Sequence, residues 1–511
     1  MRRRGRIAGL ALVVALATVL SGCVAWFRPA PVPTRTSTPV AEDVAPELEP
    51  FYRQFLVWQG CGEGLECATA SAPLDWSDPA AASIELALVR APATGTAQGS
   101  LLVNPGGPGA SGFDFVRDSL DFAVSDRLRE HYDIVGFDPR GVGRSSAVRC
   151  YDDPAVLDRF NYGIVPGQKG SPEWLAAVEQ EVASFGQSCL EFTGPLLQFV
   201  DTTSAARDLD LLRAILGDET LTYLGYSYGT FLGATYAELY PDKVGRLVLD
   251  GALDPDTDGF DVTKAQAVGF ESAFRAYLAD CLGQDGCPFT GTVDAAEQRA
   301  HALLDQLAAH PLTGADGREL GESTMFAAVI LPLYSQSNWP YLDQLFAEVT
   351  RGETETAFLL ADSYNERNSD GTYSSNQTEA FTAINCLDYD DGPLDPATLA
   401  AEAAELASVA PVFGPPMSWG VGCEGWPFPP TRERGPIRAA GAAPILVVGT
   451  TNDPATPYQW AVNLSEELES GHLVTYHGEG HTAYNKSNSC VNDAVDSYFI
   501  DGTVPASDPQ C

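Results

Sequence analysis

Three residues far apart in the chain have the types that serine acyl transfer requires: a nucleophile, a base and a carboxylate. Ser227 is the centre of Gly225-Tyr226-Ser227-Tyr228-Gly229, between an apolar run and a helix-like stretch. Asp453 and His481 each follow a run typical of a buried strand. A serine attacks a carbonyl when a histidine takes its proton and a carboxylate orients that histidine. We therefore expect Ser227, His481 and Asp453 to form a proton relay.

Each of these residues also has an ordinary interpretation. A glycine-rich turn can match the pattern around Ser227 by chance, Asp-Pro is a common turn opener, and His481 could be a surface-loop histidine. His477, at the end of the last expected strand, is the alternative base. The chain order favours the relay, because serine, then aspartate, then histidine, each after a strand, is the order of an α/β-hydrolase.

Two backbone amides are candidates for holding the oxyanion of such a reaction. One is the amide of Tyr228, directly after the nucleophile. The other belongs to the glycine-rich loop 104–112, where we favour Gly107 over Gly106. Glycines let backbone amides approach a developing negative charge without side-chain obstruction. A plain Gly/Pro turn is the alternative interpretation of this loop.

The elements that must position these residues alternate along the chain. Expected strands precede and follow the Ser227 turn, with a helix before it at 202–216, and this alternation predicts a mostly parallel sheet covered on both faces. Residues 252–438 instead carry helical patterns and no convincing strand run. We predict an α/β-hydrolase core at 46–251 and 439–511, interrupted by a helical cap at 252–438. The expected strands are 83–89, 99–104, 132–138, 221–224, 246–250, 444–448 and 472–476, and the expected cap helices are 262–282, 295–309, 322–334, 341–350 and 396–407.

The first 45 residues are typical of an exported protein. Arginines precede an apolar run that is short for a membrane span, and the run ends in Leu20-Ser21-Gly22-Cys23, which resembles a bacterial lipobox. We predict a signal peptide at 1–22, acylation of Cys23, and a disordered tether at 23–45 that is rich in Pro, Thr and Ser. An ordinary cleaved signal with an incidental Cys23 is the alternative. The expected location is the outer face of the cell membrane, with release from it as a variant.

The remaining ten cysteines are an even number in a chain expected to reach an oxidising compartment. Metal binding is the competing use, but no CxxC pair or Cys/His cluster with zinc spacing is present. Sequence does not determine connectivity, although the spacing favours pairing between neighbours. Those pairs would be Cys61 with Cys67, Cys150 with Cys189, Cys281 with Cys287, Cys386 with Cys423, and Cys490 with Cys511.

The formal net charge of -39 makes nucleic acid an improbable partner. Such acidity is typical of a soluble, self-repelling surface, and it favours cationic peptides only weakly. We expect peptide substrates, a membrane attachment through the lipid alone, a monomer, and no metal or organic cofactor.

Taken together, these motifs resemble the secreted tripeptidyl-aminopeptidase branch of the prolyl-aminopeptidase-like α/β-hydrolases of actinobacteria. The resemblance rests on residues 104–109, 137–145, 225–229 and 453–457 with Gly480-His481, and it extends from about residue 51 to 511. It implies an exopeptidase that removes short peptides, typically tripeptides, from free N-termini beneath a helical cap. The family also includes enzymes assayed as esterases, so the resemblance implies acyl-transfer chemistry on either peptides or esters.

An aminopeptidase must bind a protonated α-amine, most simply with a buried carboxylate in the cap. Glu271 and Asp388 are the candidates, although a solvated helix face or a helix cap is the more ordinary role for each. Two other functions stay open: a carboxylesterase on the same scaffold, and a peptide-binding lipoprotein without turnover. Hydrolysis of N-acetylated substrates would distinguish the first, and failure of Ser227 to react with a fluorophosphonate would favour the second.

Overall fold

A computed structural model describes residues 35–389, 395–420, 422–431 and 434–511. The predicted signal peptide, Cys23 and the first part of the predicted tether lie outside the described residues. Within them, no helix combines the length and the apolar character needed to cross a membrane.

A ten-stranded sheet forms the centre of the core, in the order β1-β2-β3-β4-β6-β5-β7-β8-β11-β12. Strands β5, β6, β7, β8, β11 and β12 pair in parallel, and β1 to β4 pair in antiparallel fashion at one end. This confirms the predicted mostly parallel sheet of an α/β-hydrolase. The strands are β1 (Arg35–Thr36), β2 (Val57–Gly62), β3 (Leu65–Pro73), β4 (Ser83–Ala91), β5 (Ser100–Asn104), β6 (Asp133–Phe137), β7 (Leu221–Tyr226), β8 (Val244–Asp250), β11 (Ile445–Asn452) and β12 (Gly471–Glu479).

Both faces of the parallel strands inside the sheet, β5, β6, β7, β8 and β11, are largely buried, which explains their continuous apolar runs. Along β8, Leu247 and Leu249 pack in one apolar cluster, while Val248 packs in the cluster on the opposite face. Helices α7 and α8 cover the first face, and α3, α4 and α18 contribute to the second. The helices of the core are α2 (Glu49–Tyr52), α3 (Gly112–Ala123), α4 (Asp126–His131), α7 (Thr202–Leu216), α8 (Tyr228–Leu239), α17 (Tyr458–Glu467) and α18 (Ser489–Asp501).

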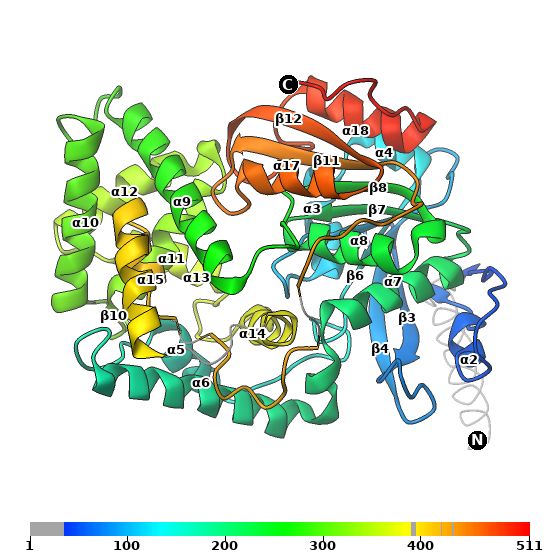
Figure 1. Cartoon of the computed structure of the whole chain (residues 1–511), viewed down its shortest axis with the longest axis horizontal. Coiled ribbons are helices and arrows are strands. Elements are labelled where there is room, and N and C mark those ends of the chain that lie inside the picture. Colours follow the sequence, from blue (N-terminus) through cyan, green and yellow to red (C-terminus); the bar gives the residue numbers. More distant parts are fainter. Residues whose placement is uncertain (1–34, 390–394, 421, 432–433) are drawn as a thin grey trace, which may run out of the picture.

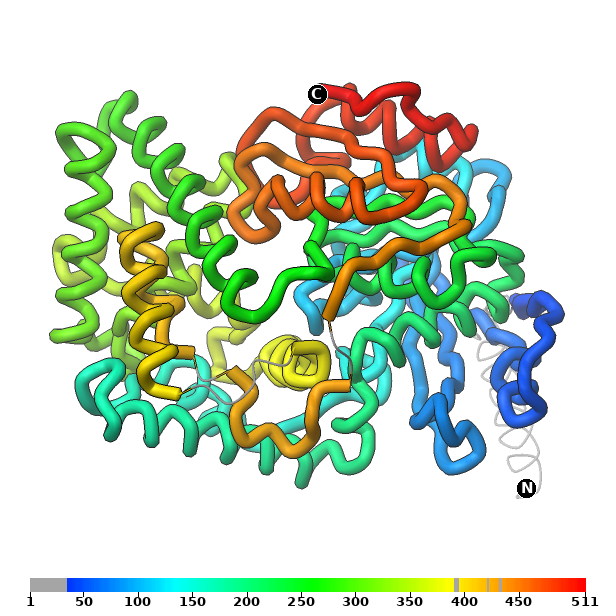
Figure 2. Tube along the Cα trace, in the orientation of Figure 1, coloured from blue at the N-terminus to red at the C-terminus, as the bar shows by residue number. Residues whose placement is uncertain are grey.

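A group of helices stands beside the sheet at the left of Figure 1 and has its own apolar cluster. Figure 2 shows the chain leaving the core after β8 and returning to it before β11. The five helices expected from sequence are present, and the segment also contains a two-stranded ribbon that the sequence patterns did not indicate. The elements are α9 (Gly259–Cys281), α10 (Val293–Ala309), β9 (Leu312–Thr313), β10 (Glu319–Leu320), α11 (Glu322–Leu333), α12 (Trp339–Thr350), α13 (Glu355–Tyr364), α14 (Gln377–Asp388), α15 (Pro396–Val409) and α16 (Gly414–Met417).

The helical layer does not coincide with the predicted cap boundaries. Helices α5 (Pro154–Tyr162) and α6 (Pro172–Thr193), from the segment assigned to the core, run beneath the cap in Figure 1, and Tyr162 packs in the cap cluster. Helix α14 belongs to the segment predicted as cap, but its residues Ala383 and Leu387 pack in the apolar cluster of the sheet. Short 3-10 turns at Gly194–Phe199, Pro241–Lys243 and Gln336–Asn338 complete the elements.

The last part of the predicted tether, residues 35–45, packs on the core instead of being free. Strand β1 pairs with β2, and Val40 N–H donates to Ala214 O at 2.9 Å. The Glu42 carboxylate accepts from Arg213 at 2.7 Å and from Lys243 at 2.8 Å. Proline-rich composition predicted a solvated chain, but these ion pairs and ladder bonds hold the segment.

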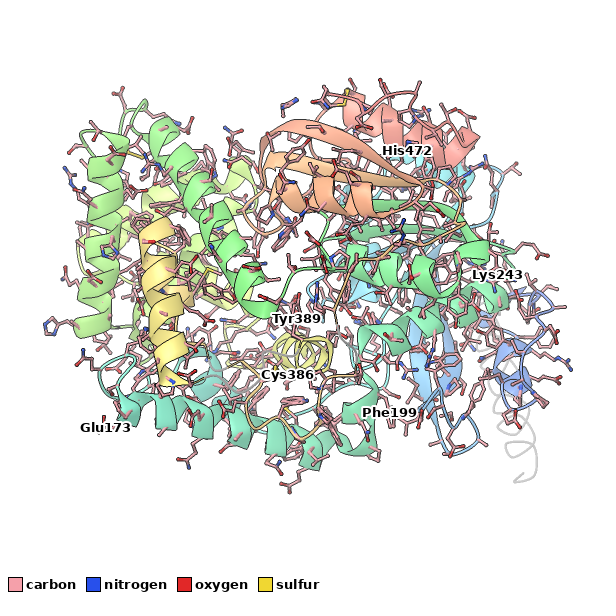
Figure 3. All side chains as sticks on the ribbon, in the orientation of Figure 1. Glu173, Phe199, Lys243, Cys386, Tyr389 and His472 are labelled. Carbon is pink, nitrogen blue, oxygen red and sulfur yellow. A yellow bond between two sulfur atoms is a disulfide. The ribbon has the colours of Figure 1, made fainter. Side chains whose placement is uncertain are left out.

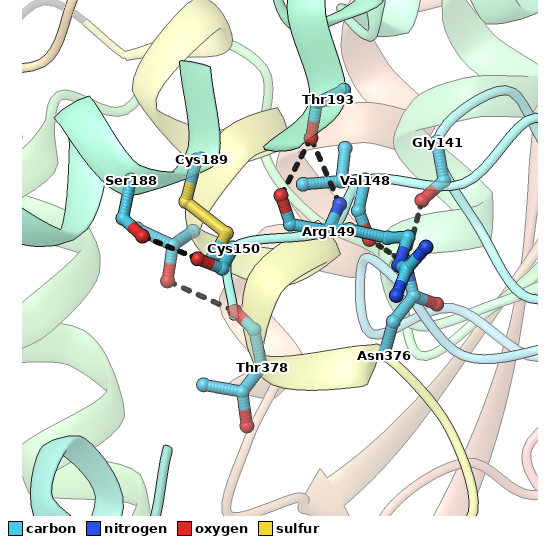
Figure 4. Close-up of a disulfide and its surroundings, with 10 residues drawn as sticks. Gly141, Val148, Arg149, Cys150, Ser188, Cys189, Thr193, Asn376 and Thr378 are labelled. Carbon is cyan, nitrogen blue, oxygen red and sulfur yellow. Dashed lines mark hydrogen bonds between the residues drawn. A yellow bond between two sulfur atoms is a disulfide. The ribbon is translucent and has the colours of Figure 1, made fainter. Parts of the chain in front are cut away.

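The ten cysteines form five disulfides in the same neighbour pairs that their spacing favours. Figure 4 shows Cys150–Cys189, which joins the loop after β6 to the end of α6. Beside it, the Asn376 amide donates to Gly141 O at 2.9 Å and to Val148 O at 2.8 Å. These contacts attach the N-terminal end of α14 to the core.

Candidate active site

Ser227 occupies the sharp turn between β7 and α8, with φ 54° and ψ -125°. Its N–H donates to Asp250 O at 2.9 Å. The flanking glycines are required by space: a Cβ at Gly225 would lie 2.3 Å from Gly229 O, and one at Gly229 would lie 2.8 Å from Asn104 Oδ1. The serine side chain does not cap α8 and lines a cavity instead. This geometry presents the hydroxyl to a bound molecule, as a nucleophile elbow does.

His481 and Asp453 meet at the carboxyl ends of β12 and β11. His481 Nδ1 lies 2.9 Å from Asp453 Oδ1 and 3.0 Å from Oδ2, and the Asp453 side chain is fully buried. Thr456 Oγ1 also lies 3.2 Å from Nδ1. The hydrogen bonds of the His481 ring in the described structure run through Nδ1, and His481 lines the same cavity as Ser227. Nε2 is therefore the nitrogen that can serve a serine or a substrate.

Backbone amides hold the Asp453 carboxylate in place. Ala455 N–H and Thr456 N–H donate to Oδ1 at 2.9 and 2.8 Å, and Thr482 N–H donates to Oδ2 at 3.1 Å. Donors directed at both oxygens fix the orientation of the carboxylate. The Asp-Pro turn is thus both a structural turn and the support of His481.

The loop after β5 packs directly against the nucleophile turn. A Cβ at Gly106 would lie 2.5 Å from Tyr226 O and 3.0 Å from the Ser227 side chain, and Gly106 has φ 96°. The Gly106 N–H already donates to Asn104 Oδ1 at 2.9 Å, whereas Gly107 lines the cavity. The Tyr228 N–H is the first of α8 and has no intrahelical partner. The amides of Gly107 and Tyr228 are consequently the better placed pair for an oxyanion.

The cavity lies between core and cap and has a volume of about 840 Å³. Ser227, Tyr228, Gly107 and His481 line it from the core, and apolar side chains such as Phe270, Ile330, Phe381 and Met417 line it from the cap. The disulfide partners Cys386 and Cys423 are part of its wall. Figure 3 shows Cys386 on α14 and Tyr389 directly after it, between the cap helices and the sheet. A cavity of this size and lining accommodates a small, largely apolar ligand.

Neither predicted amine-binding carboxylate lines this cavity. Glu271 Oε2 accepts from Val412 N–H at 2.9 Å and Phe413 N–H at 3.1 Å, and burial raises the pKa of Glu271 to about 7. Glu271 thus supports the start of α16 from within the cap.

Asp388 also points away from the cavity, toward the first turn of α7. It accepts from Thr202 N–H at 3.0 Å and from Thr202 Oγ1 at 2.5 Å, and burial raises its pKa to about 7. The same Thr202 hydroxyl contacts the Tyr228 hydroxyl. The role of Asp388 in the structure is therefore to hold the residue that follows the nucleophile, by way of Thr202.

Glu366 is the carboxylate that sequence reasoning missed. Among the described residues that line the cavity it is the one acidic side chain, and no lysine or arginine accompanies it. It follows α13 in a left-handed conformation, with φ 55°, and its carbonyl accepts from Ser374 N–H at 2.9 Å. Nothing in the local sequence distinguishes it from a solvated loop glutamate, because its exposure to the cavity depends on how the segment after α13 packs in the folded chain.

The structure also shows where the alternative base and a candidate metal-binding group lie. His477 Nε2 lies 2.8 Å from Gln510 Oε1 in an exposed position, away from the cavity. Cys281, Cys287 and Asp343 form a group with metal-like spacing in the described part of the chain, but the two sulfurs are joined in a disulfide. Cys23 lies outside the described residues.

The chain is similar to known proteins along its whole length. A family model described as TAP-like protein matches residues 410–511. The chain is 36% identical over 539 residues to serine protease Hip1 of Mycobacterium tuberculosis, covering 100% of this chain and 99% of the relative. It is 39% identical over 497 residues to carboxylesterase B of the same species, covering 94% and 92%. It is 31% identical over 469 residues to a tripeptidyl aminopeptidase of Streptomyces lividans, covering 89% and 86%.

Proposed function

The chain belongs to the tripeptidyl-aminopeptidase-like family of α/β-hydrolases and is a serine hydrolase; from this premise we propose that it is an exported exopeptidase releasing tripeptides from free N-termini. The observation that carries the chemistry is the 2.9 Å contact between His481 Nδ1 and Asp453 Oδ1 at the wall of the cavity that Ser227 lines. The proposal assigns Ser227, His481 and Asp453 to one relay.

The reaction follows from these positions. Ser227 Oγ attacks the peptide carbonyl while His481 Nε2 takes its proton, and Asp453 stabilises the imidazolium through Nδ1–H. The amides of Gly107 and Tyr228 donate to the oxyanion of the tetrahedral intermediate. His481 then gives the proton to the leaving amine, which departs as the shortened peptide. Water, deprotonated by His481, hydrolyses the acyl-enzyme and releases the N-terminal fragment.

Selection of a free N-terminus is assigned to Glu366. A protonated amine in a cavity with apolar walls loses hydration and requires a nearby counter-charge. Glu366 supplies the one negative charge on the described wall, and this replaces Glu271 and Asp388 in that role. The cavity volume of about 840 Å³ favours short peptides over folded proteins.

A paired-substrate assay tests the exopeptidase proposal. Purified protein is given tripeptidyl amides with a free amine and the same compounds with an acetylated amine. Preference for the free amine is expected, because acetylation removes the charge that Glu366 would bind. Equal rates would contradict the exopeptidase proposal while leaving the serine chemistry intact.

Carboxylesterase activity is the second candidate, since the relative named carboxylesterase B is 39% identical to this chain. An acyl-enzyme forms from esters as well as amides, so the scaffold permits both. Higher kcat/KM for simple acyl esters than for any free tripeptidyl amide would favour the esterase.

We further propose that Cys23 carries a lipid that holds a monomer on the outer face of the membrane. The support is the sequence Leu20-Ser21-Gly22-Cys23 after an apolar run. Replacement of Cys23 by Ala is expected to move the protein from the membrane fraction to the soluble fraction, and persistence in the membrane would contradict lipid anchoring. Light scattering of the soluble form should give the mass of one chain.

A further inference from the structure

Asp250 connects the two loops of the proposed relay without itself lining the cavity. It is the last residue of β8, fully buried, and its strand lies between β7, which precedes Ser227, and β11, which precedes Asp453. In register it is opposite Tyr226 on one side and Val448 on the other. A side chain at this point can contact segments that follow several strands.

The main chain and the side chain of Asp250 hold different parts of the site. Its carbonyl accepts the Ser227 N–H at 2.9 Å. Its carboxylate accepts Ala483 N–H at 3.0 Å and Tyr484 N–H at 2.8 Å, directly after His481. Since Asp453 accepts the Thr482 N–H, three successive amides of the histidine loop are held by two carboxylates.

The residue after Asp250 leaves room for the imidazole. Gly251 has φ 69°, and a Cβ there would lie 2.7 Å from the Thr482 methyl and 3.3 Å from His481 Cε1. Asp250 and Gly251 therefore form one short segment that contacts both the nucleophile turn and the histidine loop. We propose that Asp250 is a positioning residue, whose ionised carboxylate fixes the His481 loop relative to the Ser227 turn.

A nearby ammonium compensates the charge of this carboxylate. Lys486 donates to Thr482 Oγ1, and its Nζ lies 4.4 Å from the Phe122 ring centroid and 5.1 Å from that of Tyr226. Burial lowers the pKa of Lys486, and the charges of Asp250 and Asp453 act against that change.

Burial also affects the protonation of the Asp250 carboxyl group. Burial raises the pKa of Asp250 to about 6, while Lys486, the two amides and His481 oppose that rise. Among the described residues, Tyr226 and Tyr484 are further titratable groups on the adjoining segments, and burial holds their pKa values well above the usual range. Below about pH 6, Asp250 becomes neutral and holds the two amides less strongly, so hydrolysis should weaken as the pH falls through this range.

The inference rests on the proposed relay, and Asp250→Asn tests it. The variant keeps the backbone carbonyl and the side-chain shape but lacks the charge. We expect kcat to fall about 100-fold with KM little changed, because a small displacement of the base has that effect. The acidic limb of the kcat/KM profile should move to lower pH, since a neutral residue no longer stabilises the imidazolium.

Lys486→Met gives a second test that does not depend on the folding of Asp250→Asn. Loss of the ammonium should make Asp250 harder to ionise and move the acidic limb to higher pH, opposite to the first variant. Asp496→Asn is the matched control: Asp496 is a buried carboxylate that accepts from the Tyr484 hydroxyl at 2.7 Å and not from the backbone of the histidine loop.

The outcomes separate this inference from the proposed function. Opposite shifts of the acidic limb, with Asp496→Asn close to wild type, would support the positioning role. The positioning role would be overturned if Asp250→Asn folds and has wild-type kcat and an unchanged acidic limb in its kcat/KM profile. If Asp250→Asn does not fold, an unchanged acidic limb in Lys486→Met would overturn the role. A wild-type protein without hydrolysis or fluorophosphonate labelling would instead contradict the proposed function.

Discussion

Tyr334, at the end of cap helix α11, accepts a hydrogen bond from the main-chain N–H of His481 at 2.9 Å. The two rings also lie close, with centroids 5.3 Å apart. The proposed base is therefore held by Asp453 and Asp250 of the core and by the backbone of the cap. A change in the position of the cap would change the position of the imidazole.

Gly480→Ala should disturb this contact. A Cβ at Gly480 would lie 2.9 Å from Tyr334 O, at φ 102°. We expect a decrease in kcat/KM of about 10- to 100-fold, through displacement of His481. Gly441→Ala is the matched control, because Gly441 has φ 84° but a Cβ there would meet nothing within 4 Å. Both variants should lose about 1–2 kcal/mol of unfolding free energy from the left-handed backbone, and equal loss of activity in both would contradict a specific role for the Tyr334 contact.

Asp453→Asn should remove the carboxylate that orients His481. We expect kcat to fall by about 10⁴, because the histidine loses its orientation and the imidazolium its counter-charge. The folded state should also be less stable, since the asparagine NH2 group replaces one carboxylate oxygen and cannot accept a backbone N–H. Steady-state kinetics with thermal unfolding measures both effects, and near-wild-type kcat would exclude Asp453 from the relay.

Glu366→Gln should lower kcat/KM for substrates with a free amine and not for acetylated ones. Loss of a hydrogen bond to a charged group costs about 1.5–3 kcal/mol, on the order of 10- to 100-fold in kcat/KM. The acetylated substrates should be hydrolysed at nearly the wild-type rate. Glu355→Gln, an exposed position on the neighbouring α13, is the control. Parallel losses for both classes of substrate would show that Glu366 does not select the amine.

The placement of Ser227, Asp453 and His481 at one edge of the sheet could be predicted from sequence, because the carboxyl ends of parallel strands meet there. Ser227, Asp453 and His481 each follow a strand of that sheet, so their convergence follows from the alternation of elements. The disulfide pairs could be proposed for a similar local reason, since each pair is close in sequence.

No sequence pattern indicated the contacts between residues that are distant in the chain. Glu366 faces the cavity and Asp388 faces Thr202 because of how α13 and α14 pack, and helical periodicity does not specify which neighbour a helix meets. The attachment of residues 35–45 depends likewise on Glu42 meeting Arg213, 171 residues away in the chain. The composition of this segment predicted a free tether, but ion pairs with distant residues hold it on the core.

Buried carboxyl groups should make the protein less stable as pH rises. Burial raises the pKa of Asp388 and of Glu379 to about 7, from ordinary values of 3.8 and 4.5. Between about pH 5 and pH 8 the folded chain then binds more protons than the unfolded chain, so the free energy of unfolding decreases with pH. Chemical unfolding at several pH values should show this decrease, with a smaller slope for Asp388→Asn. A stability that increases over the same range, or an unchanged slope in the variant, would contradict these pKa directions.

The most direct measurement is covalent labelling of the wild-type protein by a fluorophosphonate, with the modified residue located by mass spectrometry. The account predicts one adduct on the peptide that contains Ser227, formed rapidly in wild type and far more slowly in His481→Ala. No adduct at Ser227, or equal labelling rates in the two proteins, would contradict the proposed relay.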